Sequence, residues 1–376
     1  MKKKIFITIG VIAIIAVGLI IYLTNKYQDV ITIGAIMPLT GDAAAWGVPP
    51  RNGALLAVEE INKSGGINGK RLKLIIEDGA CDPKSGVNAI NKLIASDKPI
   101  AIVGEVCSGV TLAIAPIAQS NQIVLISPAS THPDITDLGD YVFRVIPSDA
   151  LRSQIFAEYI ATLGHKSAYV LAINNESGKG IEMNFKKFFE LNGGKVIGSE
   201  FYTPDATTVK TQLTKIRQLN PDIILAISQV TDAVIVLKEA KELAIDLPLF
   251  FLTEALDDPS VIRNAGNAAN GATYISFAIN ESKKNQEFQT AYKNRFNEEP
   301  NLFAPEAYDA VMIIAKQLSV LMKDKKDISA KNLESILYNV SNFDGASGLI
   351  SFDKNGDVIK PLDIKRIENL MPVVVK

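Results

Sequence analysis

The sequence predicts an α/β protein that is built on parallel sheets and divided into two domains. Apolar strand-like runs alternate with amphipathic helical patterns in two successive series, which is the arrangement that parallel sheets require. Runs such as 100–103 are apolar throughout, as expected for strands buried on both faces. A length of 376 residues fits two domains better than one, and 47% hydrophobic with 21% charged residues is typical of globular proteins.

The first series runs from Val30 to about Val145 and alternates strands with helices. In 53–63, the residues Ala54, Ala57 and Ile61 recur at helical spacing and mark one buried face. The predicted strands of this series are 30–38, 72–77, 100–103, 123–126 and 140–145, and its predicted helices are 53–63, 82–95 and 111–119.

The second series begins near Asp149 and repeats the alternation. Asn192-Gly193-Gly194 is a stop signal for the helix before it. The predicted strands are 167–173, 195–201, 223–227, 249–252 and 272–278, and the predicted helices are 151–163, 181–191, 209–219 and 231–243. Long helices follow within 286–320, then a loop and strand in 343–352 and a strand-like end in 361–375.

Two neighbouring strands of the first series end in turns of small hydroxyl residues. Ser108 follows the strand at 100–103, and the turn 127–131, which contains Ser130 and ends at Thr131, follows the strand at 123–126. In a parallel sheet both turns lie at the carboxyl edge, where ligands bind. Hydroxyls beside free main-chain N–H groups suit a carboxylate. The alternative is that these residues only form the turns.

Four further side chains are candidates for the same crevice. Glu254 ends a strand in an apolar loop, where a carboxylate can meet a cation, and Trp46 lies in the first loop, where a ring can cover an apolar ligand. Ser177 and Gln229 follow strands of the second series. The alternatives are a surface carboxylate, a core tryptophan and solvated turn residues.

Residues 1–25 differ in character from the rest of the chain. Three lysines precede an apolar run at 5–23, which as a helix would measure roughly 28 Å and cross a bilayer. No A-x-A cleavage site or lipid-attachment cysteine follows. We expect an uncleaved membrane anchor, with a cleaved signal peptide as the alternative. In either case the rest of the chain is exported to the periplasm or the outer face of the membrane.

Export affects the expected chemical state of the two cysteines, Cys81 and Cys107. In an oxidising compartment such a pair forms a disulfide, and the alternative is two buried free thiols. A catalytic cysteine is disfavoured because no histidine lies near either one in the sequence.

Several function classes lack their usual signals. The net charge is −2 with no long basic block, so nucleic-acid binding is not expected. His132 and His165 are the only histidines and lie far apart, which disfavours a histidine metal site. The dinucleotide, P-loop and G-x-S-x-G motifs are absent, so we expect no cofactor and no enzymatic activity.

Several short motifs follow one another along the chain in a fixed order. They are Ile33-Gly34, Pro38-Leu39-Thr40-Gly41, NKSGGING at 62–69, DGACDP at 78–83, Cys107-Ser108, SPAST at 127–131, PDIT at 133–136 and Phe143-Arg144. With this spacing the chain resembles the type I periplasmic binding proteins of branched-chain amino-acid transport, the Leu/Ile/Val-binding proteins. The likeness covers roughly residues 30–360.

The resemblance implies two α/β lobes that are joined by three crossovers and close on a ligand like a hinge. We expect lobe 1 to comprise 30–148 with 279–345, and lobe 2 to comprise 149–278 with 346–376. The family's disulfide falls on Cys81 and Cys107.

The resemblance also implies how a ligand is held. The family's carboxylate clasp falls on Ser108 and Thr131. The ligand ammonium would meet the Ala129 carbonyl, the Thr131 hydroxyl and Glu254, and the aromatic residue near the ligand side chain matches Trp46.

The chain departs from the family in the second lobe. Ser177 stands where these binders often carry tyrosine, and Gln229 replaces a further tyrosine in a less certain register. The side-chain pocket is therefore expected to differ. We expect a binding protein that delivers an amino acid to the permease of an ABC transporter. The alternative is a receptor module that senses amino acids or aliphatic amides.

Overall fold

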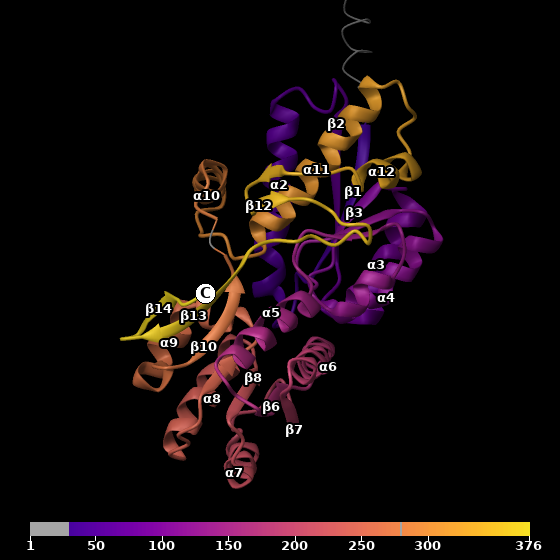
Figure 1. Ribbon diagram of the computed structural model, residues 1–376. Helices are drawn as coiled ribbons and strands as arrows, with labels where there is room; N and C mark the ends of the chain where they lie inside the picture. Colours follow the sequence, from indigo (N-terminus) through magenta and orange to yellow (C-terminus); the bar gives the residue numbers. More distant parts are fainter. Residues whose placement is uncertain (1–29, 279) are drawn as a thin grey trace, which may run out of the picture.

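The computed structural model describes residues 30–278 and 280–376, which fold around two separate sheets (Figure 1). The predicted anchor at 5–23 and the whole of 1–25 lie outside the described residues. Within the described ranges, no helix combines the length and the apolar character needed to cross a membrane.

The first sheet is wholly parallel, with the strand order β2-β1-β3-β4-β5. Its central strands β3 and β4 are completely buried, as their uninterrupted apolar sequences predict. The strands are β1 (Val30–Met37), β2 (Arg71–Asp78), β3 (Ala101–Gly104), β4 (Val124–Ser127) and β5 (Val142–Arg144).

Helices cover both faces of the first sheet. On one face the core includes Ala54, Val311 and Leu333, and on the other it includes Leu93 and Ile114. The covering helices are α2 (Ala44–Lys63), α11 (Ala304–Lys323) and α12 (Ala330–Leu337) on the first face, and α3 (Pro83–Ser96) and α4 (Ser108–Ser120) on the second. Helix α10 (Lys283–Phe296) packs beside α2.

Helix α2 begins earlier than predicted, at Ala44 instead of residue 53. Pro49 and Pro50 lie inside it, although proline generally disfavours a helix interior. Gly53 lets α2 pass close to α11, because an added Cβ would lie 2.1 Å from the Ala304 carbonyl oxygen. Packing against α11 therefore decides the helix start more than local preference does.

The second sheet has the order β14-β13-β10-β9-β8-β6-β7 and is parallel except at one edge. There β13 runs antiparallel to β10, and β14 antiparallel to β13, so the predicted single end strand is a hairpin. The strands are β6 (Ser167–Ile173), β7 (Lys195–Tyr202), β8 (Ile223–Ile227), β9 (Leu249–Phe251), β10 (Thr273–Phe277), β13 (Leu362–Glu368) and β14 (Met371–Val374).

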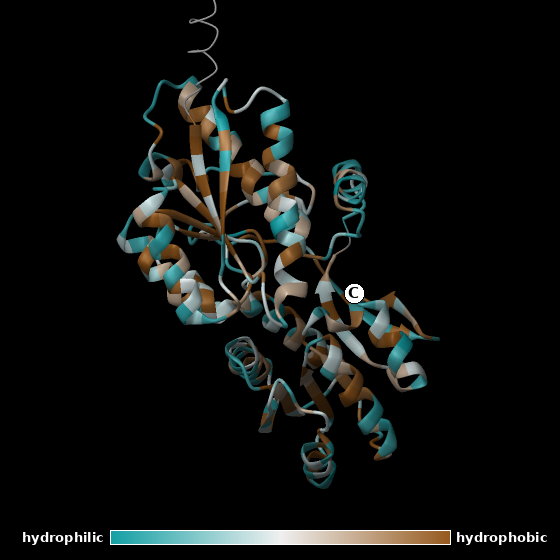
Figure 2. Cartoon of the chain, turned by 180° about the vertical axis from the view of Figure 1, so that it is seen from behind, coloured by the Kyte–Doolittle hydropathy of each residue, from teal (hydrophilic) through white to brown (hydrophobic). Residues whose placement is uncertain are grey.

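Side chains of this sheet alternate between two helical layers. Val170 and Leu225 face α5 and α6, whereas Leu171 and Ile224 face the opposite layer. The helices are α5 (Asp149–Thr162) and α6 (Glu176–Leu191), then α7 (Lys210–Leu219), α8 (Val230–Glu242) and α9 (Pro259–Ala265). Figure 2 shows apolar strands within and polar residues on the outer helical surfaces. Short 3-10 helices are η1 (Pro133–Asp137), η2 (Glu254–Asp257) and η3 (Gly266–Ala269).

The described chain passes between the sheets three times: after β5, after β10, and after the small hairpin of β11 (Phe343–Gly345) and β12 (Gly348–Ile350). Ile350, Phe352 and Val358 pack in the core of the first sheet. This packing places the third passage later than the predicted boundary at residue 346.

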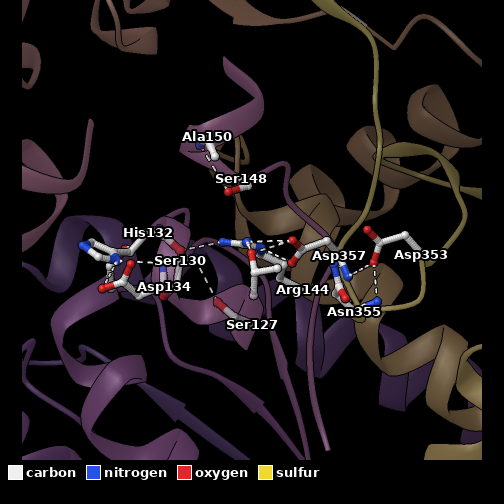
Figure 3. Close-up of polar contacts among 12 residues, drawn as sticks. Ser127, Ser130, His132, Asp134, Arg144, Ser148, Ala150, Asp353, Asn355 and Asp357 are labelled. Atoms are coloured by element: carbon white, nitrogen blue, oxygen red, sulfur yellow. Dashed lines mark hydrogen bonds and ion pairs between the residues drawn. The ribbon is translucent and has the colours of Figure 1, made fainter. Parts of the chain in front are cut away.

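A buried arginine holds the third passage against the first lobe (Figure 3). The Arg144 Nε donates to Asp357 at 2.5 Å, and its other nitrogens donate to the Thr136 hydroxyl and the His132 carbonyl. Arg144 is fully buried, so the segment around Asp357 is fixed by charge-assisted bonds in a poorly solvated place.

Candidate functional site

The carboxyl edges of the two sheets face each other. Helix α6 directly follows β6 of the second sheet, and it contacts both α4 and η1, which follow β3 and β4 of the first. The contact is close, since a Cβ added to Gly180 would lie 2.7 Å from the His132 ring. The loops predicted to carry the site therefore lie where the lobes meet.

Ser108 and Thr131 both lie at this edge and are nearly buried. Ser108 is the first residue of α4, and its hydroxyl oxygen accepts a hydrogen bond from the His132 N–H at 3.4 Å. Its own proton is therefore free to be donated. The Thr131 hydroxyl donates to Asp149 at 2.6 Å, which leaves its lone pairs to accept. The Thr131 N–H has no acceptor among the described residues.

The two residues before Thr131, Ala129 and Ser130, differ in the hydrogen bonds that they form. The Ala129 carbonyl accepts no hydrogen bond from the described residues, so it remains available. Ser130 is fully buried; its hydroxyl donates to the Glu105 carbonyl at 2.9 Å and its N–H donates to Ser127. Ser130 therefore turns its polar groups into the first lobe.

Glu254 begins η2 in the second lobe and is bound by an arginine. The Arg152 Nη1 donates to the Glu254 Oε2 at 2.5 Å, and the same guanidinium donates twice to Asp149. Burial alone would lower the pKa of Arg152, but its two carboxylate partners raise it above the ordinary value. A hydrogen-bonded chain thus links Thr131 of the first lobe to Glu254 of the second.

The other predicted site residues lie at helix starts. Trp46 is half-buried in the first turn of α2, not in a loop, and its ring centroid lies 6.1 Å from that of Phe303. Ser177 is the second residue of α6, and Gln229 is the exposed residue that precedes α8. Among the described residues, no hydrogen bond, ion pair or ring contact joins these three to Thr131 or Glu254, whereas hydrogen bonds connect Thr131 with Glu254 through Asp149 and Arg152.

The disulfide between Cys81 and Cys107 is confirmed, with a Cα–Cα distance of 5.5 Å. It joins the loop after β2 to the residue before α4, and so fixes the backbone beside Ser108. Glu105 lies under this turn and is fully buried. Its Oε2 accepts the Cys107 N–H, while its Oε1 has no hydrogen-bond partner within 30–278 and 280–376.

Sequence reasoning missed Asp149 and Arg152. The available signal was an acidic residue and an arginine three positions apart at the start of a helix that is otherwise largely apolar on one face. The tertiary partners Thr131 and Glu254, 18 and 102 residues distant in sequence, gave no local signal.

Chemically, the arrangement offers both donors and acceptors, and the acceptors include a negative charge. The donors are the Ser108 hydroxyl and the Thr131 N–H. The acceptors are the Ala129 carbonyl, the Thr131 hydroxyl oxygen and Glu254. The described ranges contain no cluster of metal-ligating side chains. This arrangement suits a small dipolar molecule.

Comparison with known proteins gives a consistent result. A family model described as periplasmic binding protein matches residues 30–369. The chain is 29% identical over 333 residues to the leucine-, isoleucine-, valine-, threonine- and alanine-binding protein of Pseudomonas aeruginosa. That match covers 88% of this chain and 87% of the relative.

Solved structures agree in fold. A branched-chain amino-acid transporter substrate-binding protein LivJ of Streptococcus pneumoniae, solved with isoleucine, is 27% identical, with a TM-score of 0.78 over 92% of this chain and 99% of that one. A leucine-binding protein LivK of Thermotoga maritima is 25% identical, with a TM-score of 0.79 over 92% and 98%.

Proposed function

The chain belongs to the periplasmic binding protein family, and from this premise we propose that it binds an amino acid outside the cytoplasm and delivers it to an ABC transporter. It acts as a solute-binding protein and not as an enzyme. The relatives named for leucine, isoleucine and valine support a branched-chain or related ligand. The permease is the protein partner of the ligand-bound form.

One observation carries the proposal. A single chain of hydrogen bonds, buried except at Glu254, joins Thr131, Asp149, Arg152 and Glu254 across the two lobes. It brings an uncharged acceptor and a carboxylate to the same end of the site, as an ammonium group requires. The Ser108 hydroxyl and the Thr131 N–H would hold the carboxylate at the opposite end of the ligand.

Binding by both lobes explains hinge closure. A ligand that touches Ser108 and Thr131 on one side and Glu254 on the other gains its full set of contacts only when the lobes meet. It therefore binds the closed form more tightly, which is the condition for shifting the equilibrium towards closure. The closed form then presents both lobes to the permease.

Within this proposal, Trp46, Ser177 and Gln229 border the ligand side chain. Trp46 offers a ring on the first lobe, and Ser177 and Gln229 offer polar groups on the second. Such a pocket would admit an amino acid that is larger or more polar than leucine. We also propose that residues 1–25 direct export, with 5–23 as the anchor.

Calorimetry with a panel of amino acids and aliphatic amides tests the function. We expect L-leucine, L-isoleucine or a related amino acid to bind the wild-type protein, and Glu254→Ala to lose most of that affinity. Glu287→Gln, an exposed carboxylate on α10, is the matched control and should bind like the wild type. Undiminished binding by Glu254→Ala would remove Glu254 from the site. Binding of amides but of no amino acid would favour the sensing alternative.

A further inference from the structure

Arg152 is a buried cation at the centre of the proposed ammonium end. Its side chain is 3% exposed and lies between Asp149, 1% exposed, and Glu254, 26% exposed. Its guanidinium carbon also lies 5.3 Å from the centre of the Phe277 ring, at the end of β10. Every group that fixes Arg152 therefore belongs to the second lobe or its junctions with the first.

Arg152 uses only one of the two oxygens of Glu254. It donates to Oε2, while Oε1 accepts nothing from the described residues and the side chain keeps some exposure. A guanidinium has donors alone and cannot rotate into an acceptor. Glu254 is thus held in one orientation with its second oxygen free for a ligand.

In a similar way, Asp149 fixes the direction in which the Thr131 hydroxyl donates its hydrogen bond. Its Oδ1 accepts from Arg152, so its Oδ2 is left for the Thr131 hydroxyl, which donates at 2.6 Å. Burial raises the pKa of Asp149. The Arg152 guanidinium and the Thr131 hydroxyl oppose this rise in pKa, and both of their hydrogen bonds need carboxylate oxygens that accept. The hydroxyl proton of Thr131 is therefore directed away from the ligand.

The net charge of the group formed by Asp149, Arg152 and Glu254 also favours a cation. Two carboxylates and one guanidinium leave a net charge of −1, which one ligand ammonium neutralises. A ligand end that is neutral or negative would leave the site unbalanced and would face acceptors only.

We propose that Asp149 and Arg152 are positioning residues that select an α-ammonium group, acting through Thr131 and Glu254. Arg152 orients the carboxylate of Glu254, and Asp149 makes the Thr131 hydroxyl an acceptor. This inference rests on the proposed function and adds the residues that discriminate amino acids from the corresponding simple acids.

Asp149→Asn gives a sharp test because it reverses a hydrogen bond with little change in shape. The amide oxygen must face Arg152, which only donates, so the amide nitrogen must face Thr131 and donate to it. The Thr131 proton then points at the ligand ammonium. The variant also removes one negative charge from the group.

Isothermal titration at pH 7 with L-leucine and with 4-methylpentanoate, the same molecule without its ammonium group, measures the effect. We expect the wild type to prefer leucine at least 100-fold, and Asp149→Asn to lower this preference at least tenfold while 4-methylpentanoate binds as well or better. Arg152→Gln should lower the preference in the same direction and serves if Asp149→Asn does not fold.

Asp309→Asn is the matched control. Asp309 is also a buried carboxylate that accepts a hydroxyl, that of Ser347, but it lies on α11 in the first lobe. It should alter stability and leave the ligand preference unchanged. A purely structural role for Asp149 would weaken both ligands equally, and this result would overturn the inference.

The outcomes for the two proposals are distinct. If the wild type prefers leucine and both variants keep that preference, only the positioning role fails. If the wild type prefers neither leucine nor any other amino acid of the panel over the corresponding acid without its ammonium group, the proposed function fails and this inference fails with it.

Discussion

Glu105 makes the stability of the first lobe depend on pH in a predictable direction. Burial raises its pKa to about 8 from an ordinary value of 4.5, against the lowering effect of the Cys107 and Val106 N–H groups and with a further rise from Asp78. Between these two pH values the unfolded chain releases the proton while the folded protein retains it. The folded state is therefore destabilised progressively as the pH rises from 4.5 to 8.

The magnitude follows from the same two values. At about 1.36 kcal/mol for each pH unit, the whole interval sets an upper limit of about 5 kcal/mol, of which about 3.5 kcal/mol falls between pH 5 and pH 8. Glu105→Gln has the shape of the protonated side chain and still offers an oxygen to the Cys107 N–H. It should match the wild type at pH 5 and exceed it at pH 8.

Urea unfolding of both proteins at pH 5, 6, 7 and 8 measures this difference. Glu299→Gln, a carboxylate that is 67% exposed, is the control and should follow the wild type at every pH. If the gap between Glu105→Gln and the wild type stayed constant from pH 5 to pH 8, the argument from burial would be refuted.

Three further predictions concern closure and stability. Gly180→Ala should weaken ligand binding at least tenfold with little loss of stability, because the new methyl group would meet the His132 ring only when the lobes touch. Gly109→Ala is the control in calorimetry, since its added Cβ would lie 3.7 Å from the nearest atom. Equal ligand affinities of the two variants would contradict the closure model. Reducing the disulfide, which closes a 26-residue separation, should lower the free energy of unfolding by about 3–4 kcal/mol in urea titrations, and an unchanged midpoint would exclude that contribution. Asp357→Asn should cost about 3–5 kcal/mol because it leaves the buried Arg144 without its anion; a loss below about 1 kcal/mol in thermal unfolding would show that the pair is dispensable.

Most elements could be predicted from local pattern, and the misses have physical causes. Strands β6 and β8 match their predicted bounds because both are short apolar runs between clear turn signals. Helix α2 was predicted to start nine residues late, since its prolines argue against a helix that packing on α11 nevertheless stabilises. The end of the chain was predicted as one strand, but Asn369 and Leu370 adopt positive φ and turn it into a hairpin.

In the candidate site, too, local sequence pattern indicates some features and leaves others to the tertiary structure. Ser108, Thr131 and Glu254 were predicted because each follows an apolar strand, and the carboxyl ends of parallel strands form a common edge. Ser130 has the same sequence signal as Thr131, yet its hydroxyl bonds inward to the Glu105 carbonyl. Adjacent residues of an irregular turn can point in opposite directions, and composition does not distinguish them.

By itself, the sequence determined the alternation of strands and helices, the carboxyl-edge turns and the pairing of the cysteines. These follow from periodicity, from turn chemistry and from an ordered set of motifs. Only the tertiary structure decided the antiparallel edge of the second sheet and the ion pair between Arg144 and Asp357. It also decided the grouping of Asp149, Arg152 and Glu254. The reason is that buried charges are stabilised by partners distant in sequence, and no local pattern records which of them the fold brings together.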